Sequence, residues 1–320
     1  MSNQDAQARE TMTILVPLDG SPAAESVLPA VVALARRLPA RVALLHVLER
    51  NAPERVHGER HLHSPAEAES YLQGIATRLA ADGIAATWHL HQLPVGDIPL
   101  SIAGHAAERD AGLIVLAAHG AGGPRSWLTG AVAQGVIRHA APPVLLLRGD
   151  ARRPGPFAPE EVVAALDTTR QGEVALPPAA RLARALDIPL RLLAVTPTVE
   201  TMPGDSAVVG RLLPSGAAAA LDLEAAAAAD YLAALARRIA GRPGAPPVVS
   251  EVARGDPAQI MLARTQSRPI VLALATHGRT GLDALWSGSI GSRVIARGGG
   301  PFLLVHPEGA DAEPLETAGA

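Results

Sequence analysis

The chain carries one sequence pattern twice, and this duplication restricts the possible folds more than any other feature. Residues His119–Leu147 align without a gap with His277–Val305. Upstream, Leu18-Asp19 matches Leu166-Asp167. A repeat of roughly 150 residues is far longer than a solenoid repeat and long enough to bury its own core. The sequence therefore predicts two complete domains in tandem.

Each half alternates short apolar runs with amphipathic segments. The runs have the length of strands, and they are Thr13–Leu18, Arg41–Leu48, Ala85–Leu90, Leu113–Ala117, Val144–Leu147, then Val162–Leu166, Leu190–Val195, Val248–Val252, Ile270–Ala275 and Phe302–Val305. Apolar residues recur at helical spacing over Val27–Leu38 and Leu176–Leu186, and Ser21-Pro22 is typical of a helix start. Apolar strands separated by amphipathic helices indicate a parallel sheet covered on both faces. We predict an α/β fold with two tandem doubly wound, Rossmann-like domains.

The expected domain boundaries follow from composition. Residues 149–157 are rich in Pro, Gly and charge, as in a linker, and they separate a first domain at 11–148 from a second at 158–306. Residues 1–10 and the small, acidic segment 307–320 are expected to be disordered.

Composition excludes several classes of function. A net charge of −3, three tryptophans, two tyrosines and two phenylalanines leave little to bind or stack nucleic acid. No apolar run approaches the roughly 18 to 20 residues of a membrane span, and without cysteine there is no disulfide or thiol chemistry. Residues 1–10 are polar, unlike a secretory signal, so we expect a cytoplasmic protein without nucleic acid or membrane partners.

A spaced glycine motif follows the apolar run Ile270–Ala275. It reads Gly278-Arg279-Thr280-Gly281, nine further residues, then Gly291-Ser292. Glycines let the backbone approach phosphate oxygens closely, and a helix opened by Ser292 would add a hydroxyl and the positive end of a helix dipole. This pattern predicts a phosphate-binding loop.

An aspartate ends the first strand of each half, at Asp19 and Asp167. Ligands of open parallel sheets bind at the carboxyl ends of the strands, where the strand order reverses. If the first and fourth strands are neighbours, each aspartate faces the glycine loop of its own half. A carboxylate does not bind phosphate but accepts hydrogen bonds from hydroxyl or amino groups, such as those of ribose or adenine. Together these features predict a nucleotide site.

The first half contains an altered copy of the motif. Gly120 and Gly123 are kept, but Ala133 and Gln134 stand where the second half has glycine and serine. If the glycine adopts a left-handed conformation, alanine costs about 1 to 2 kcal/mol there. We therefore expect the first site to bind at least about tenfold more weakly, although Gln134 can still donate a hydrogen bond.

With these motifs, both halves resemble universal stress protein domains, over residues 11–148 and 158–306. The resemblance implies a five-stranded parallel sheet of order 3-2-1-4-5 in each half, and binding of ATP with or without Mg²⁺. Carried over by position, the implied second-domain site comprises Ala165, Leu166, Asp167, Val195, Gly278, Arg279, Gly281, Gly291, Ser292, Arg293 and Val294. The weaker first-domain site comprises Pro17, Leu18, Asp19, Val47, Gly120 and Gly123.

Three functions are compatible with this site. The favoured one is a regulatory module of a stress response that binds an adenine nucleotide. A second is a slow ATP hydrolase or phosphotransferase, although neither a P-loop lysine nor a kinase loop motif occurs. A third is a scaffold without nucleotide. The last strands of the halves are candidates for pairing the two domains as an intramolecular pseudo-dimer, and two chains as a homodimer.

The histidines admit functional and structural interpretations. His119 and His277 precede the glycine loops, but no motif pairs them with a nucleophile, so structural contacts are the favoured reading. Residues His57, His61, His63, His89 and His91 could gather a metal ion, but neutral surface histidines are favoured over a metal site. We accordingly predict neither a catalytic residue nor a metal ligand.

Overall fold

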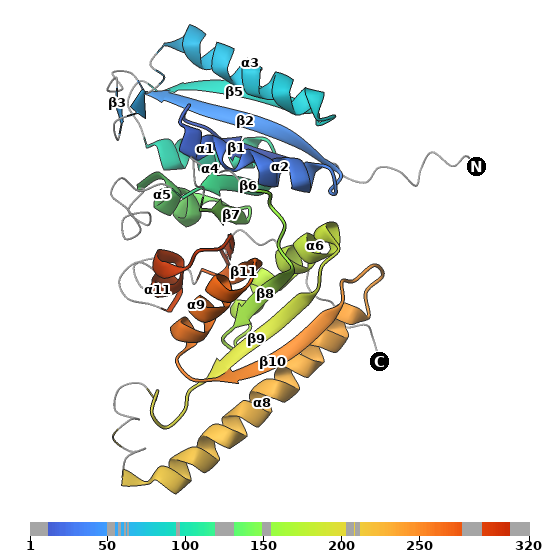
Figure 1. Ribbon diagram of the computed structural model, residues 1–320, viewed down its shortest axis with the longest axis vertical. Coiled ribbons are helices and arrows are strands. Elements are labelled where there is room, and N and C mark those ends of the chain that lie inside the picture. The colour runs from blue at the N-terminus through green and yellow to red at the C-terminus, as the bar shows by residue number, and fades with distance from the viewer. Residues whose placement is uncertain are drawn as a thin grey trace, which may run out of the picture. The chain divides into compact units, whose positions relative to one another are not determined.

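The structure is a computed structural model, and it forms two compact units, one up to Phe157 and one over Ala158–Pro307 (Figure 1). The described residues are 12–49, 55–56, 59–60, 62, 64–93, 97–118, 131–148, 155–202, 208, 212–276 and 290–307. Most of the segments expected to be disordered lie outside this part of the chain.

The first unit is a parallel five-stranded sheet with a small antiparallel ladder. Its elements are β1 (Met12–Pro17), α1 (Pro22–Glu25), α2 (Leu28–Ala35), β2 (Ala40–Glu49), β3 (Arg55–Val56), β4 (Glu59–Arg60), α3 (Pro65–Ala81), β5 (Ala86–Leu93), α4 (Ile98–Glu108), β6 (Ala111–Ala117), α5 (Ala131–His139) and β7 (Val144–Leu147). The strand order is β5-β2-β1-β6-β7, and β3 pairs with β4. Counting only the sheet strands along the chain, this is the order 3-2-1-4-5.

The second unit repeats this sheet. Its elements are β8 (Glu161–Leu166), the 3-10 helix η2 (Gly172–Ala175), α6 (Leu176–Leu186), β9 (Leu190–Thr196), α8 (Pro214–Ala240), β10 (Val248–Arg254), α9 (Pro257–Ser267), β11 (Ile270–Ala275), α11 (Ile290–Arg297) and β12 (Phe302–Val305). The order β10-β9-β8-β11-β12 is again 3-2-1-4-5, with all pairs parallel. The predicted α/β fold is confirmed in both halves.

The core lies on both faces of each sheet. Every residue of β7, β8 and β12 is buried, which requires helices on both sides of these strands. Helix α6 buries the positions expected from its periodicity, among them Leu182 and Leu186. Side-chain caps position several helices: Ser21, Ser64, Asp97 and Asp256 each accept a backbone N–H of the first turn.

The helix after the first strand is divided in two. The expected start at Ser21-Pro22 opens the short α1, which ends at Glu25, and the apolar periodicity of Val27–Leu38 corresponds to α2, which covers Leu28–Ala35. Pro29 explains the break, because a proline inside a helix lacks the N–H donor and its ring clashes with the carbonyl four residues earlier. The chain therefore restarts its helix with Pro29 in the first turn, where proline is tolerated.

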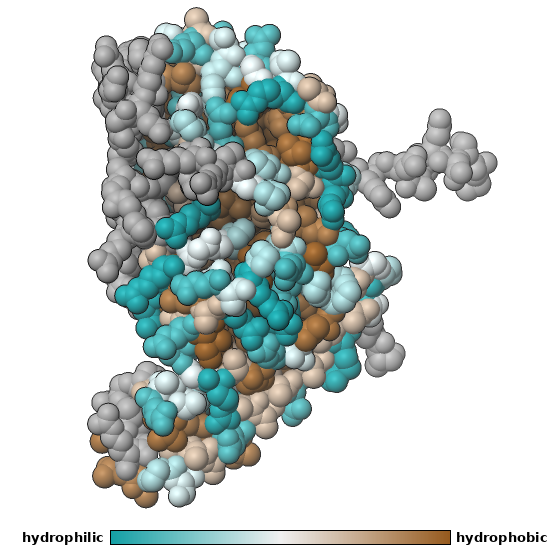
Figure 2. Space-filling view, viewed as in Figure 1, coloured by the Kyte–Doolittle hydropathy of each residue, from teal (hydrophilic) through white to brown (hydrophobic). Residues whose placement is uncertain are grey.

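Helix α8 is the longest described helix and carries exposed apolar side chains near its start. Leu212, Leu213 and Leu223 are each more than half exposed. Figure 2 shows apolar surface at that end of α8. Farther along, Leu232 and Ile239 are buried where α8 packs on β9 and β10.

Candidate functional site

The sheets place both predicted aspartates at the point where the strand order reverses. In the second unit β8 lies between β9 and β11, and in the first unit β1 lies between β2 and β6. Asp167 follows β8, and Asp19 lies two residues after β1. The first and fourth strands are thus neighbours, as the predicted site requires. This crevice is where open α/β sheets bind ligands.

Each aspartate stabilises a tight turn, and the two turns are of the same kind. Asp167 Oδ1 accepts hydrogen bonds from Thr169 N at 3.0 Å and Thr169 Oγ1 at 2.6 Å, and Asp19 Oδ1 accepts one from Ser21 N at 2.9 Å. The residue between them has positive φ in each case, +60° at Thr168 and +87° at Gly20. One oxygen of each aspartate therefore has a structural role. The Asp167 side chain is nevertheless exposed and accessible to a ligand.

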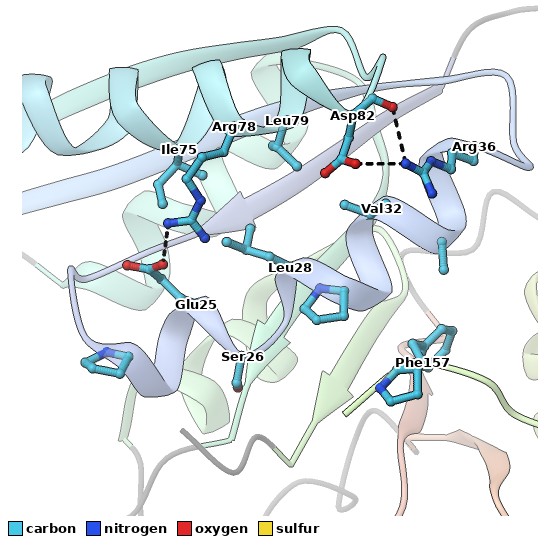
Figure 3. A pocket seen from close by; sticks show the side chains of 14 residues that line it. Glu25, Ser26, Leu28, Val32, Arg36, Ile75, Arg78, Leu79, Asp82 and Phe157 are labelled. Carbon is cyan, nitrogen blue, oxygen red and sulfur yellow. Dashed lines mark hydrogen bonds and ion pairs between the residues drawn. The ribbon is translucent and has the colours of Figure 1, made fainter. Parts of the chain in front are cut away.

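A Glu-Tyr-Arg group lies beside each aspartate. In the second unit Tyr231 donates to Glu173 Oε1 at 2.9 Å, and Arg238 pairs with the same carboxylate. Its counterpart in the first unit is the pair of Arg78 and Glu25, 2.9 Å apart (Figure 3). Repeat alignment equates Glu25 with Glu173, but only the structure shows that Tyr231 and Arg238 bind Glu173 and that Arg78 pairs with Glu25.

The tyrosines of these groups are half-buried. Burial raises the pKa of Tyr71, and the carboxylates of Glu25 and Asp19 raise it further. Burial also raises the pKa of Tyr231, followed by its hydrogen bond to Glu173. Neither tyrosine was among the predicted site residues. The signal that could have found them is a shared spacing, with an arginine seven residues after the tyrosine in both repeats.

Backbone groups near the first-domain site already form hydrogen bonds within the fold. Leu18 N donates to Leu45 O at 2.8 Å, and Leu18 O lies 2.7 Å from Nδ1 of the buried His46. Pro17 and Val47 are buried. In the second unit Ala165 and Leu166 are likewise buried, whereas Val195 is half-buried at the carboxyl end of β9.

A buried hydroxyl distinguishes the second unit. Thr196, which follows Val195, is 3% exposed, and its Oγ1 has no hydrogen-bond partner within the described part of the chain. The corresponding residue of the first unit is the apolar, buried Leu48. A buried hydroxyl without a partner is costly unless a ligand or water satisfies it.

The helix after the glycine loop contains four predicted site residues. Gly291, Ser292, Arg293 and Val294 all lie in α11, with Val294 fully buried. Arg293 is held toward α9 by an ion pair with Asp256 at 3.5 Å. The loop residues Gly278, Arg279 and Gly281, and their counterparts Gly120 and Gly123, lie outside the described residues, as do His119 and His277.

Gly291 does not adopt the left-handed conformation that would have made Ala133 costly. Gly291 lies within α11 and Ala133 within α5, and neither is among the residues with positive φ. Alanine is well tolerated in a helix, so Ala133 carries no conformational cost. Any difference between the two sites at this position must come from the methyl group itself. Ser292 also lies inside α11, which begins at Ile290, rather than opening that helix.

The first unit also contains a pocket beside the Arg78–Glu25 pair. It has a volume of about 690 Å³ and lies between α1, α2 and α3 (Figure 3). Apolar side chains line it together with the ion pairs Arg78–Glu25 and Arg36–Asp82. None of the predicted site residues that the structure describes lines this pocket.

Comparison with known proteins settles the family. The sequence model of the universal stress protein family matches residues 10–148 and again residues 160–306. The chain belongs to the universal stress protein family. With one match in each half, it is a tandem universal stress protein of two domains, as the resemblance predicted. None of its described helices is long and apolar enough to cross a membrane.

Solved universal stress proteins share the fold. One from Archaeoglobus fulgidus is similar over 93% of this chain and 99% of its own, with 19% identity and a TM-score of 0.66. A putative one from Pseudomonas aeruginosa covers 93% of this chain and 94% of its own, at 14% identity and a TM-score of 0.55. A shorter one from Archaeoglobus fulgidus, in complex with dAMP, covers 42% of this chain and 96% of its own, at 26% identity and a TM-score of 0.33. Comparison with curated proteins finds no match.

Proposed function

We propose that this universal stress protein binds an adenine nucleotide, ATP with or without Mg²⁺, mainly in its second domain. The observation that carries the proposal is the exposed carboxylate of Asp167 at the carboxyl end of β8, where the strand order reverses. In sequence, the second half also keeps the complete glycine motif after the neighbouring strand β11. Binding would act as a regulatory signal in a stress response.

The donors and acceptors of the second domain fit such a ligand. Asp167 can accept hydrogen bonds from ribose hydroxyls or an amino group, and the backbone of Val195 would lie against adenine. The buried hydroxyl of Thr196 needs a partner, which a nucleotide or an ordered water supplies. Residues Gly278, Arg279, Gly281, Gly291 and Ser292 would hold the phosphates, because backbone N–H groups near a helix N-terminus favour anions.

Unequal use of the two domains is part of the proposal. The first domain has Leu48 where the second has Thr196, and Ala133 where the second has Gly291. A methyl group on α5 would occupy space that the hydrogen of Gly291 leaves to a phosphate. The arrangement therefore favours one tight site per chain.

A matched pair of substitutions tests this asymmetry. Gly291→Asp adds a negative charge beside the proposed phosphates, and Ala133→Asp places the same charge at the corresponding point of the first domain. We expect Gly291→Asp to abolish ATP binding in a calorimetric titration and Ala133→Asp to leave it within about twofold. Loss of binding in the Ala133→Asp variant alone would show that the wrong domain has been assigned.

The purified protein also tests the two alternative functions. If the protein binds nucleotide stoichiometrically and also releases inorganic phosphate from ATP, an ATPase activity would be added to the binding function. Absence of any nucleotide, even with added ATP, would support the scaffold alternative. Light scattering tests the expected homodimer, and fractionation of cells tests the expected cytoplasmic location.

A further inference from the structure

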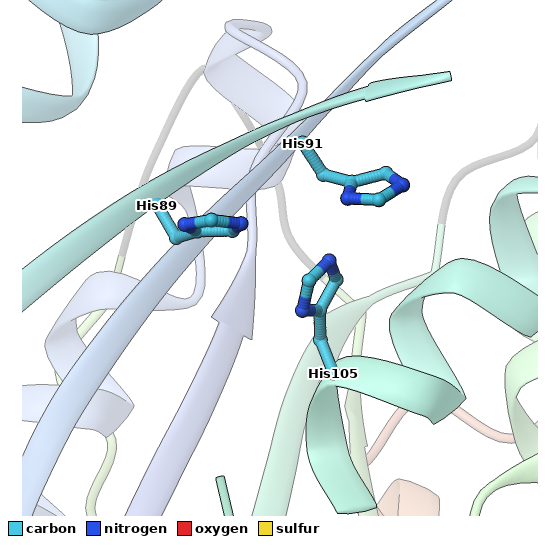
Figure 4. A group of neighbouring side chains, drawn as sticks. All are labelled: His89, His91 and His105. Carbon is cyan, nitrogen blue, oxygen red and sulfur yellow. The ribbon is translucent and has the colours of Figure 1, made fainter. Parts of the chain in front are cut away.

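Three histidines of the first unit meet on one face of the sheet. His89 and His91 come from β5, and His105 comes from α4 (Figure 4). The ring centroids of His89 and His105 are 4.9 Å apart, and those of His91 and His105 are 4.6 Å apart. One nitrogen from each ring lies within 4.8 Å of the other two. His105 is buried, while the two strand residues are half-buried.

Local structure explains why these rings meet. Alternate residues of a strand share a face, so His89 and His91 point to the same side of β5. The carboxylate of Asp97 caps α4 by accepting from Leu100 N at 3.2 Å, which fixes where the helix starts. His105 then lies on the buried face of α4. The sequence pattern named the two strand histidines but not His105, because its approach depends on the crossover connection.

The second unit fills the equivalent place with charges. His91 pairs with Val47 on β2, and Ala253 pairs with Val195 on β9, so His89 corresponds to Glu251. Likewise His105 and Arg264 are each eight residues after the capping aspartate of their helix.

In that place Glu251 forms ion pairs with Arg264 and, at 3.0 Å, with Arg191. The second unit thus satisfies its polar groups internally, whereas the first unit gathers three imidazoles.

We propose that His89, His91 and His105 together bind one divalent cation of the late first transition row, with Zn²⁺ as the reference ion. Imidazole nitrogen is a preferred ligand of these ions, and three histidines form a known type of zinc site with a fourth position left for water. This inference goes beyond nucleotide binding and is independent of it.

A carboxylate lies beside the buried ligand. Glu108 Oε2 is 3.0 Å from His105 Nδ1, but the two do not meet the geometry of a hydrogen bond. Metal-binding histidines commonly donate their second nitrogen to a carboxylate, which fixes the ring and makes it a better ligand. We expect Nδ1 to donate to Glu108 when Nε2 binds the ion. Glu108 also offsets the positive charge of the nearby Arg109.

The separation of the nitrogens is compatible with closure around an ion. Zn–N bonds of about 2.1 Å at tetrahedral angles place two nitrogens about 3.4 Å apart. Since the nitrogens lie within 4.8 Å of one another, each pair has to close by at most about 1.4 Å. Rotation of the half-buried His89 and His91 can supply this movement without disturbing the core. The adjoining pocket of about 310 Å³, lined by His91 and His105 among others, gives the ion a path from solvent.

The test is metal titration of the full chain, prepared without a histidine tag. We expect one Zn²⁺ per chain in competition with a chromophoric chelator, and a visible absorption band of tetrahedral, nitrogen-bound Co²⁺. Replacing both His89 and His91 with Ala should weaken Zn²⁺ binding at least about 100-fold, because losing even an outer partner of a ligand costs about 10- to 100-fold. Glu108→Gln should weaken binding about tenfold and keep the Co²⁺ band.

Two control variants make the result specific. His139→Ala removes an exposed histidine from α5, and a triple variant replaces His57, His61 and His63 with Ala; both should bind Zn²⁺ like the unchanged protein. Circular dichroism should match across all variants. Absence of Zn²⁺ binding to the unchanged chain, equal affinity in the His89 and His91 double variant, or loss of binding only in the triple variant would overturn the proposal.

Discussion

At the residue scale, the structure gives the predicted aspartates two roles. Asp167 holds its turn through Oδ1 and at the same time presents an exposed carboxylate to the crevice. The sequence could predict its position, since it directly follows an apolar run that ends where ligands bind. The turn with positive φ at Thr168 could not be predicted, because only glycine signals that conformation reliably.

The substitution Asp167→Asn separates these roles. Asparagine keeps an oxygen acceptor for Thr169 but removes the negative charge. We expect unchanged folding and about tenfold weaker ATP binding, corresponding to ~1.4 kcal/mol, because hydrogen bonds to charged groups are stronger than neutral ones. Asp19→Asn is the matched control and should leave ATP binding unchanged. An equal effect of both substitutions in calorimetry would contradict the unequal sites.

Tyr71 and Tyr231, the two tyrosines of the chain, predict a pH dependence. Burial raises the pKa of both above the unfolded value of about 10. Above pH ~10 the unfolded state therefore binds fewer protons than the folded state. The contribution of the two tyrosines to the free energy of unfolding is fully present below this pH and falls as the pH rises.

Phenolate absorbance and circular dichroism should consequently change together in an alkaline titration. Phenolate absorbance with a midpoint near pH 10 and intact secondary structure would show that the tyrosines are not shielded. The Phe and Trp side chains do not ionise, so the phenolate absorbance reports only on the two tyrosines.

At the scale of elements, a glycine can be required where two helices pack closely, and the sequence does not reveal which glycine has this role. A Cβ built on Gly135 of α5 would lie 2.4 Å from Pro99 Cβ of α4. Gly74 of α3 has no atom within 4 Å of the same position. Both glycines look alike in the sequence, since each interrupts a helical segment. The difference depends on which helix packs against which, and therefore on the tertiary fold.

These two glycines should respond to alanine in opposite directions. Gly135→Ala should destabilise the protein by about 1 to 3 kcal/mol, because the proline ring cannot move aside easily. Gly74→Ala should stabilise it by about 0.5 to 1 kcal/mol through the better helix propensity of alanine. Denaturant unfolding measures both. Stabilisation by Gly135→Ala would contradict the close packing of α4 on α5.

The boundaries of the helices, like the packing of these glycines, could be predicted only in part from the sequence. The strands were predicted closely because their apolar runs are short and end at polar residues. The break between α1 and α2 was not predicted, although Pro29 marks it, because the helix start at Ser21-Pro22 and the apolar periodicity from Val27 together predict one helix. The histidine cluster was missed in part because His105 approaches β5 only through the fold.

At the scale of the whole molecule, duplication and resemblance together predicted two α/β domains of order 3-2-1-4-5, and the structure confirms this. The repeats could not reveal how each copy changed internally. Thr196 of the second domain aligns with Leu48 of the first, and the second domain has the charged group around Glu251 where the first has the three histidines. One fold thus carries two chemically different domains, which is why we assign a nucleotide to the second and a cation to the first.

The most direct test of the central claim is to count adenine nucleotides per chain. The protein would be denatured after purification, the released small molecules identified by mass, and the emptied protein titrated with ATP. We predict one tight site per chain, lost in Gly291→Asp and kept in Ala133→Asp. Two equal sites, or none at saturating ATP, would contradict the account.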